Sequence, residues 1–295
     1  MKRLFWLTLM IINIHASAQP FKTMTCNIRY DNPDDGDDRW ELRRDGLIGL
    51  IKKSDADIIG FQEVLHSQLA DLEKGLKGYE HFGVGRDDGK EEGEYSPLFV
   101  KSKRFKSLDQ GNFWLSATTE MPGKGWDAAC NRICTWSLLK DNSTKRVILV
   151  MNTHLDHQGK IARQKSVQLL LLFIEKKIEE YINGLEEGSE SGLEVILMGD
   201  FNFTPEDPNY QSLVNSGNAG REGLTDVFVT APLTADGTVG TYNGFNLEEP
   251  PVERIDYVWT TGINVRSCRH ISTKLASGRW PSDHLPILVE MEHSE

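Results

Sequence analysis

Hydrophobic and polar residues follow two periods along the chain, one typical of strands and one typical of helices. Apolar residues at every second position predict a strand over 21–30. An apolar spacing of three and four residues predicts a helix over 39–53, and the continuous apolar run 57–63 predicts a buried strand. The longest helix is expected over 160–181, with an apolar stripe along one side.

Most of the remaining elements are predicted to be strands. Strands are expected over 79–84, 96–100, 113–116, 132–139, 146–154, 194–199, 241–245, 255–260 and 285–291, with one further helix over 65–76. Strands that are apolar on both faces need cover on both sides. No Pro/Gly/Ser-rich linker interrupts the chain, so the pattern predicts a single α/β domain over 19–295, with two packed sheets flanked by helices.

The first 18 residues carry a different pattern. Lys2 and Arg3 precede an apolar run over 4–14, and the small residues of 16–18 follow it. This order predicts a secretory signal peptide over 1–18 and an exported protein, periplasmic or secreted. The apolar run of about 11 residues is too short to cross a bilayer, so no membrane span is expected.

Charge and cysteine content narrow the choice of partners. The chain has a formal net charge of −11, and without Lys2 and Arg3 the mature chain has −13. An acidic chain has no general attraction for polyphosphate, so nucleic acid is possible as a substrate but is not favoured by charge. The four cysteines match no zinc pattern, and their spacing leaves a Cys130–Cys134 disulfide open.

Polar residues that suit catalysis lie at the ends of predicted strands, where they would project into a common cleft. They are Asn27, Glu63, His154 with Asp156, Asp200 with Asn202, and Asp283 with His284. Asp256 lies inside an otherwise apolar strand, and an unpaired buried carboxylate is costly. His284 is the natural candidate for its partner.

These residue types suit a hard metal ion beside a water molecule. Glu63, with help from Asn27 and Asp283, offers oxygen ligands that suit Mg²⁺ or Mn²⁺. His284 would take a proton from the attacking water if Asp256 holds its other ring nitrogen. The sequence therefore predicts a phosphoester hydrolase that uses direct attack of water.

The remaining candidates would contact the phosphate. Asp200 and Asn202 would orient the nucleophile and a phosphate oxygen. His154 and Arg132 would hydrogen-bond the charge that develops on the phosphate. Each also has a plainer interpretation: a structural histidine for His154, a surface ion pair for Arg132 and a solvated loop acid for Glu94.

Taken together, six segments resemble the endonuclease/exonuclease/phosphatase superfamily, the deoxyribonuclease-I-like phosphoesterases. They occur in family order at 25–27, 60–64, 152–156, 199–202, 255–257 and 282–286. The resemblance implies a four-layer α/β/β/α sandwich with two mixed sheets, and a divalent-metal phosphoesterase. It implies that Glu63 is the main metal ligand, that His284 with Asp256 is the acid/base pair, and that Glu94 supports a phosphate-contacting His154.

Fold and core residues leave the substrate open, because this superfamily acts on many phosphoesters. The charge favours a small or lipid-derived phosphodiester or monoester, and an exported nuclease that cleaves DNA or RNA is the alternative. A hypothesis of another class is a non-catalytic protein that binds a phosphorylated ligand, which should have lost one or more of the site residues. The sequence does not determine the oligomeric state.

Overall fold

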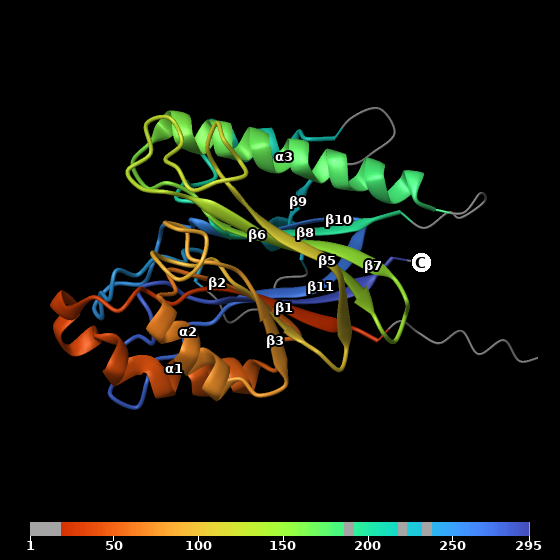
Figure 1. Cartoon of the computed structure of the whole chain (residues 1–295). Helices are drawn as coiled ribbons and strands as arrows, with labels where there is room; N and C mark the ends of the chain where they lie inside the picture. Colours follow the sequence, from red (N-terminus) through yellow and green to blue (C-terminus); the bar gives the residue numbers. More distant parts are fainter. Residues whose placement is uncertain (1–18, 186–191, 218–222, 232–237, 295) are drawn as a thin grey trace, which may run out of the picture.

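Two six-stranded sheets form the centre of the molecule and pack face to face, with helices on their outer faces (Figure 1). The computed structural model describes residues 19–185, 192–217, 223–231 and 238–294. The predicted signal peptide lies outside these residues. The four layers and the mixed sheets are as the sequence and the resemblance predict.

The first sheet is built mainly from the two ends of the chain. Its strands are β11 (Ile263–His270), β12 (Ile287–His293), β1 (Phe21–Asn27), β2 (Ile58–Gln62), β4 (Leu98–Lys101) and β3 (Tyr79–Phe82), in this spatial order. β1 and β2 are parallel, and the other neighbours are antiparallel. Helices α1 (Trp40–Ser54) and α2 (His66–Gly75) cover its outer face, and a 3-10 helix, η1 (Pro33–Asp38), precedes α1.

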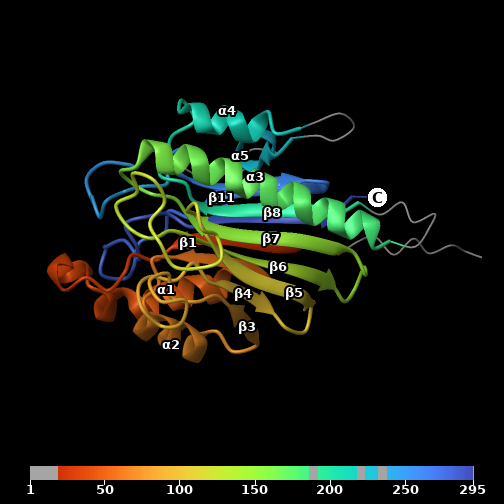
Figure 2. The same cartoon turned by 45° about the horizontal axis from the view of Figure 1, so that its top comes forward.

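The second sheet is built from the middle of the chain. Its strands are β5 (Phe105–Trp114), β6 (Ile133–Asp141), β7 (Val147–His154), β8 (Glu194–Asp200), β10 (Asp256–Thr261) and β9 (Thr225–Asp226), in this spatial order. β7 and β8 are parallel. Helix α3 (Lys160–Asn183) covers the outer face with α4 (Pro208–Val214) beside it, and the short α5 (Val227–Thr230) follows β9 (Figure 2).

Three apolar layers hold the four structural layers together: one under α1 and α2, one between the sheets and one under α3. A polar contact joins the two sheets between β7 of the second sheet and β2 of the first. Asn152 of β7 donates to the carbonyl oxygens of Phe61 and Pro97 and accepts from the side-chain amide of Gln62. Gly60 leaves room for it, because a Cβ there would stand 2.6 Å from the Asn152 oxygen.

The topology brings six strand ends to one edge of the sandwich. β1, β2, β7 and β8 end at this edge, whereas β10 and β12 run antiparallel to their neighbours and begin there. The predicted polar clusters therefore converge although they are far apart in the sequence. None of the helices in the described residues combines the length and apolar character needed to cross a membrane.

Several parts of the fold differ from the sequence prediction. The predicted strand over 241–245 is wrong: only Tyr242 makes isolated bridges, and Gly244 and Phe245 have left-handed backbones with φ of 55° and 58°. β11 and the first part of β5 were not predicted, because both carry many polar side chains and a register shift interrupts the alternation in each, at 265–267 and at 107–109. Short helix α4 also follows β8 without a prediction.

Candidate active site

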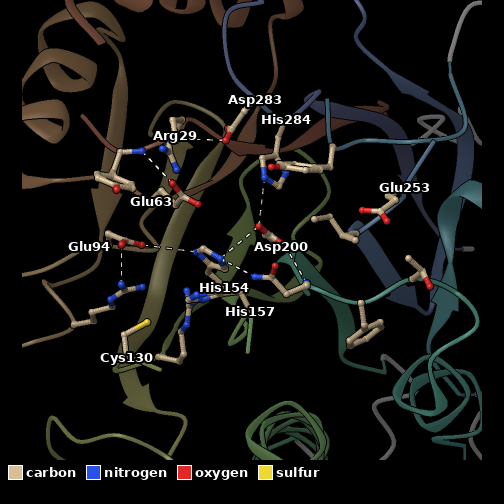
Figure 3. A pocket seen from close by; sticks show the side chains of 18 residues that line it. Arg29, Glu63, Glu94, Cys130, His154, His157, Asp200, Glu253, Asp283 and His284 are labelled. Atoms are coloured by element: carbon tan, nitrogen blue, oxygen red, sulfur yellow. Dashed lines mark hydrogen bonds and ion pairs between the residues drawn. The ribbon is translucent and has the colours of Figure 1, made fainter. Parts of the chain in front are cut away.

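A pocket of about 730 Å³ opens at the edge where the six strand ends meet (Figure 3). Eight residues predicted from the sequence line it: Glu63, Glu94, Arg132, His154, Asp200, Asn202, Asp283 and His284. Asn27 and Asp256 lie directly behind this wall, each bonded to one of its members. The structure therefore brings all ten predicted site residues together.

His284 and Asp256 form a buried pair on the pocket floor. Nδ1 of His284 lies 2.8 Å from Oδ2 of Asp256, and Nε2 faces Asp200 Oδ2 at 3.8 Å. Burial alone would lower the pKa of His284, but the negative charges of Asp256 and Asp200 outweigh it and raise the pKa well above its ordinary value. The imidazole therefore has one nitrogen fixed and one directed into the pocket.

His154 and Asn202 form the neighbouring part of the floor. The side-chain amide of Asn202 donates to His154 Nε2 at 3.0 Å and to the carbonyl oxygen of Leu155 at 2.9 Å. Burial lowers the pKa of His154, and the positive charges of Arg132 and Arg86 lower it further. His154 is therefore neutral, and its Nδ1 lies 3.9 Å from Glu94 Oε2 and has no hydrogen-bond partner among the described residues.

A group of carboxylates crowds around Asn27. Its side-chain amide donates to Glu63 Oε1 at 3.1 Å and to Asp200 Oδ2 at 3.0 Å, while its oxygen accepts from the Arg29 N–H. Burial and nearby Asp256 raise the pKa of Asp200 to about 7. Burial likewise raises the pKa of Asp283 to about 6. Such crowding costs free energy unless a cation or a proton compensates it.

This donor set fits a hard divalent cation. Oxygen atoms of Glu63 and Asp200 lie, with a ring nitrogen of His154, within 4.8 Å of one another, and Asp283 lines the same pocket. Carboxylate oxygens are the ligands that Mg²⁺ and Mn²⁺ prefer. In this arrangement Asn27 orients two of the carboxylates, since its own oxygen is bonded to Arg29.

Glu63 has a backbone conformation that is unusual for a glutamate. It follows β2 directly and has a φ of 60°, in the left-handed region. Val64 pairs with Tyr95, and the Tyr30 N–H donates to Glu63 Oε2 at 3.1 Å, so both the backbone and the carboxylate are held from outside. Strain of this kind persists where the surrounding structure enforces it, often at functional sites.

These features correspond to a known protein family. The model of the endonuclease/exonuclease/phosphatase family matches residues 24–125 and 171–284. The chain belongs to this family. It is therefore a phosphoesterase of the deoxyribonuclease-I-like fold with a candidate metal site.

Solved structures from Bacteroides are similar over almost the whole chain. A family member from Bacteroides thetaiotaomicron is 33% identical, with a TM-score of 0.81, and the match covers 94% of this chain and 97% of that one. The mannosyl-6-phosphatase of Bacteroides thetaiotaomicron VPI-5482 is 32% identical, with a TM-score of 0.79 and coverage of 92% and 99%.

A more distant relative is a nuclease. The CCR4-Not complex 3'-5'-exoribonuclease subunit Ccr4 of Aspergillus oryzae is 24% identical over 85% of this chain. The chain spans 43% of the length of that protein.

In this chain, Arg132 lines one wall of the pocket and is bonded to Asp156. Asp156 is fully buried and accepts hydrogen bonds from the N–H groups of Ala129, Gln158 and Gly159 and from Arg132 Nε. Asp156 thus stabilises the turn after β7, and it also anchors Arg132. Nη1 of Arg132 is buried without a partner among the described residues.

The structure also decides two alternatives left open by the sequence: whether Glu94 is a solvated loop acid, and whether Cys130 and Cys134 form a disulfide. Glu94 is not a solvated loop acid: it pairs with Arg86 at 2.7 Å and its side chain is 18% exposed. Cys130 and Cys134 are both free thiols, and Cys134 is buried on β6 while Cys130 lines the pocket.

The sequence prediction missed several residues of the pocket, all of them in loops. They are Arg29, Tyr30, Arg86, His157, Tyr242 and Glu253. Arg29 stands two residues after Asn27, a signal that was available in the sequence. Arg86 and Tyr242 had no such signal, because their positions depend on how distant loops pack.

A buried arginine beneath the site was also missed. Arg43 of α1 is 1% exposed and donates to the carbonyl oxygens of Ile28, Arg29, Asp38 and Pro281. It thereby fixes the segment after β1 to the segment that carries Asp283 and His284.

Proposed function

We propose that this chain is a divalent-metal-dependent phosphatase that hydrolyses a small phosphate monoester by direct attack of water. One observation carries the proposal: a single pocket joins a carboxylate cluster that suits a metal ion, the His284–Asp256 pair and three arginines. The arginines are Arg29, Arg86 and Arg132. Guanidinium groups match the geometry and charge of a phosphate.

Glu63, Asp200 and Asp283 would hold Mg²⁺ or Mn²⁺, with Asn27 orienting two of these carboxylates. The bound ion would neutralise charge on the phosphate oxygens. Because Asp200 and Asp283 both raise the pKa of His284, neutralising these carboxylates lowers that pKa toward the range of a base.

The protein groups then carry out the proton transfer and the positioning. Water on the pocket floor gives a proton to His284 Nε2 while its oxygen forms a bond to phosphorus. The bond from phosphorus to the ester oxygen breaks, and the leaving alkoxide takes up a proton from solvent water at the mouth of the pocket and departs as an alcohol. His284 then returns its proton to solvent, which restores the site. Asn202, neutral His154 and Arg132 would hydrogen-bond the phosphate oxygens, where charge develops.

The charges around the pocket disfavour a long polyanion. Three acidic segments adjoin pocket residues in the sequence, at 31–37 after Tyr30, at 87–92 after Arg86 and at 248–253 ending with Glu253. Together they carry eleven carboxylates against one lysine. Nucleic-acid binding depends on cations that follow the phosphate backbone beyond the reacting group. The arginines of this site are instead confined to the pocket, which fits a substrate with a single phosphate.

Similarity supports the same choice. The mannosyl-6-phosphatase is similar to this chain over almost the full length of both, whereas the exoribonuclease is matched over less than half of its length. A non-catalytic binding protein is disfavoured, because the structure brings every predicted site residue together.

Export belongs to the proposal as well. The pattern of residues 1–18 predicts a cleaved signal peptide, so the enzyme would act in the periplasm or outside the cell. N-terminal sequencing of the protein from its native host tests this, and a mature chain that begins at Gln19 is the expected result.

The decisive experiment is a screen for phosphate release with Mg²⁺ or Mn²⁺. The substrates are sugar phosphates, nucleotides, phospholipid headgroups, an aryl phosphodiester, plasmid DNA and RNA, with EDTA and the His284→Ala protein as blanks. Metal-dependent release from a monoester is expected. Faster cleavage of DNA or RNA, with a strong dependence on salt, would establish the nuclease alternative.

A further inference from the structure

The pocket has two chemically different sides. In Figure 3, Glu253 stands on the opposite side of His284 and Asp200 from Glu63 and Glu94. The three arginines belong to the Glu63 side, since Arg29 lies near Asp283, Arg86 pairs with Glu94, and Arg132 contacts His157. Across from them, Tyr242 and Glu253 line a part of the pocket to which no arginine contributes.

We infer that Tyr242 and Glu253 form a subsite for the alcohol part of the substrate, and that this alcohol is an uncharged polyol such as a sugar ring. The inference rests on the proposed phosphatase function. It adds the part of the substrate that the shared catalytic residues do not recognise.

Depth within the pocket assigns this side to the leaving group. Asp200 and His284 are 1% and 4% exposed and form the floor, where the attacking water is placed. In-line displacement puts the leaving oxygen opposite the water, which here means toward the mouth of the pocket. Tyr242 is 40% exposed and Glu253 is exposed, so both stand where the alcohol emerges.

The chemistry of the two side chains suits hydroxyl groups on a ring. The Tyr242 ring packs against His284, with centroids 5.1 Å apart and planes at 62°, and a large part of its surface remains open. An open aromatic face packs well against the C–H face of a sugar. The Glu253 carboxylate has no side-chain partner among the described residues and can accept hydrogen bonds from hydroxyl groups.

The same carboxylate disfavours an anionic alcohol. Glu253 follows the exposed Glu248 and Glu249 on one loop, and no lysine or arginine of that loop segment, 242–253, offsets them. A second phosphate or a carboxylate on the substrate would therefore be repelled there, whereas neutral hydroxyl groups would not.

Backbone hydrogen bonds hold the subsite rigidly against the catalytic residues. The N–H of Tyr242 donates to the Glu253 carbonyl at 3.1 Å, and the N–H of Asn243 donates to the Asp283 carbonyl at 2.8 Å. The Leu285 N–H donates to the Thr241 carbonyl at 2.7 Å. A preformed subsite loses little entropy when it binds a ligand.

The first test compares two monoesters: a hexose 6-phosphate, which reaches the subsite, and methyl phosphate, which does not. The measured quantity is the ratio of their kcat/KM values with Mg²⁺, for wild type, Tyr242→Phe and Tyr242→Ala. The ratio should fall about tenfold in Tyr242→Ala and stay close to the wild-type ratio in Tyr242→Phe, which keeps the ring. Equal ratios in all three proteins would overturn the subsite.

The second test reverses the charge. Glu253→Lys should raise kcat/KM for a hexose 1,6-bisphosphate relative to the 6-phosphate by about tenfold. The matched control is Glu249→Lys, which makes the same change of charge on the same loop outside the pocket and should leave this ratio unchanged. An equal change in both variants would show a general charge effect and overturn the role of Glu253.

Failure of the subsite is distinguishable from failure of the proposed function. If wild type releases phosphate from methyl phosphate with Mg²⁺ but the Tyr242 and Glu253 variants keep its substrate ratios, only the subsite is wrong. If wild type releases no phosphate from any monoester, the proposed function is wrong and the subsite falls with it. Circular dichroism of each variant confirms that it is folded.

Discussion

Strand β8 of one sheet and strand β12 of the other have a buried histidine near each end, and acidic side chains contact each histidine. His284 lies just before β12, next to Asp200 at the end of β8, while His293 ends β12 and contacts Glu194 at the start of β8. Both histidines are about 4% exposed. One cluster lines a pocket and the other joins the two sheets.

The clusters differ in how many of the histidine ring nitrogens have a hydrogen-bond partner. His293 bonds Glu194 through Nδ1 and Asp141 through Nε2, and Arg146 and Arg104 pair with these acids in turn. At His284, within the part of the chain that the structure describes, Nδ1 bonds Asp256 at 2.8 Å, whereas Nε2 has no bond of that length and faces the pocket.

The comparison teaches that residue type alone does not separate a structural cluster from a catalytic one. At the His293 end, arginines and an imidazolium balance the carboxylates, so the cluster contributes to stability. At the His284 end carboxylates are in excess, which costs stability and leaves a site for a cation and a proton. Four predictions test this contrast.

The largest expected effect is on catalysis. His284→Asn should lower kcat/KM about 10³-fold, because it removes the group that takes the proton from water. His293→Asn, the same substitution at the other end of β12, should leave kcat/KM at 25 °C close to wild type. Phosphate release under identical Mg²⁺ concentrations measures both, and comparable losses in the two variants would contradict the division of roles.

The second-largest expected effect is a loss of stability when His293 is replaced. His293→Asn should lower the free energy of unfolding by about 3 kcal/mol, because Asp141 and Glu194 lose the cation between them. Urea titration of wild type and variant measures the difference. The triple variant Asp141→Asn, Glu194→Gln, His293→Asn is the control. It should be more stable than the single variant, since no fully buried carboxylate is left without a cation, and Arg104 and Arg146 are partly exposed to solvent.

The third effect is the pH dependence of that stability. Burial alone would lower the pKa of His293, but hydrogen bonds to Asp141 and Glu194 raise it to about 9, above the ordinary value of 6.5. The stabilisation is therefore complete below pH 6.5 and is lost as the pH rises through 9.

Solvent screening reduces the size of this contribution, and we expect a loss of about 2 kcal/mol between pH 6 and pH 10. Urea titrations of wild type and His293→Gln at both pH values measure it. The difference in stability between the two proteins should shrink at pH 10. A difference that stays constant would mean that the charge of His293 contributes nothing.

The sequence predicted the His284 cluster but not the His293 cluster. Strand ends marked by Asn27, Asp200 and His284 predicted the pocket, and the cost of an unpaired Asp256 predicted its bond to His284. Nothing in the sequence pointed to the His293 cluster. Its three members lie at the start or end of strands whose pairing across the two sheets is set by the tertiary fold.

The missed elements have related causes. The apolar pattern detects β8 as a continuous apolar run and β1 by its alternation. In β11 a register shift between Val265 and Ser267 interrupts the alternation, and several side chains are polar. The segment 241–245 shows the opposite error, because Tyr242 lines the pocket and the Phe245 ring packs against Arg43, so neither belongs to a sheet. Loop residues such as Arg86 and Tyr242 reach the site only through packing that local patterns do not encode.

The smallest expected effect concerns the metal ion. It distinguishes the His284 cluster, where carboxylates are in excess, from the His293 cluster, where their charge is balanced. Mg²⁺ at ten times its dissociation constant should raise the free energy of unfolding by about 1.4 kcal/mol, because it binds the folded protein alone. The ion should bind where carboxylates are in excess, so Glu63→Gln should reduce this gain. His293→Asn should keep it, since its cluster lies at the far end of β12 from the site. Thermal unfolding with MgCl₂ or with EDTA, at matched ionic strength, measures the gain in each protein. An equal gain in wild type and Glu63→Gln would place the ion elsewhere and remove the contrast in charge between the two clusters.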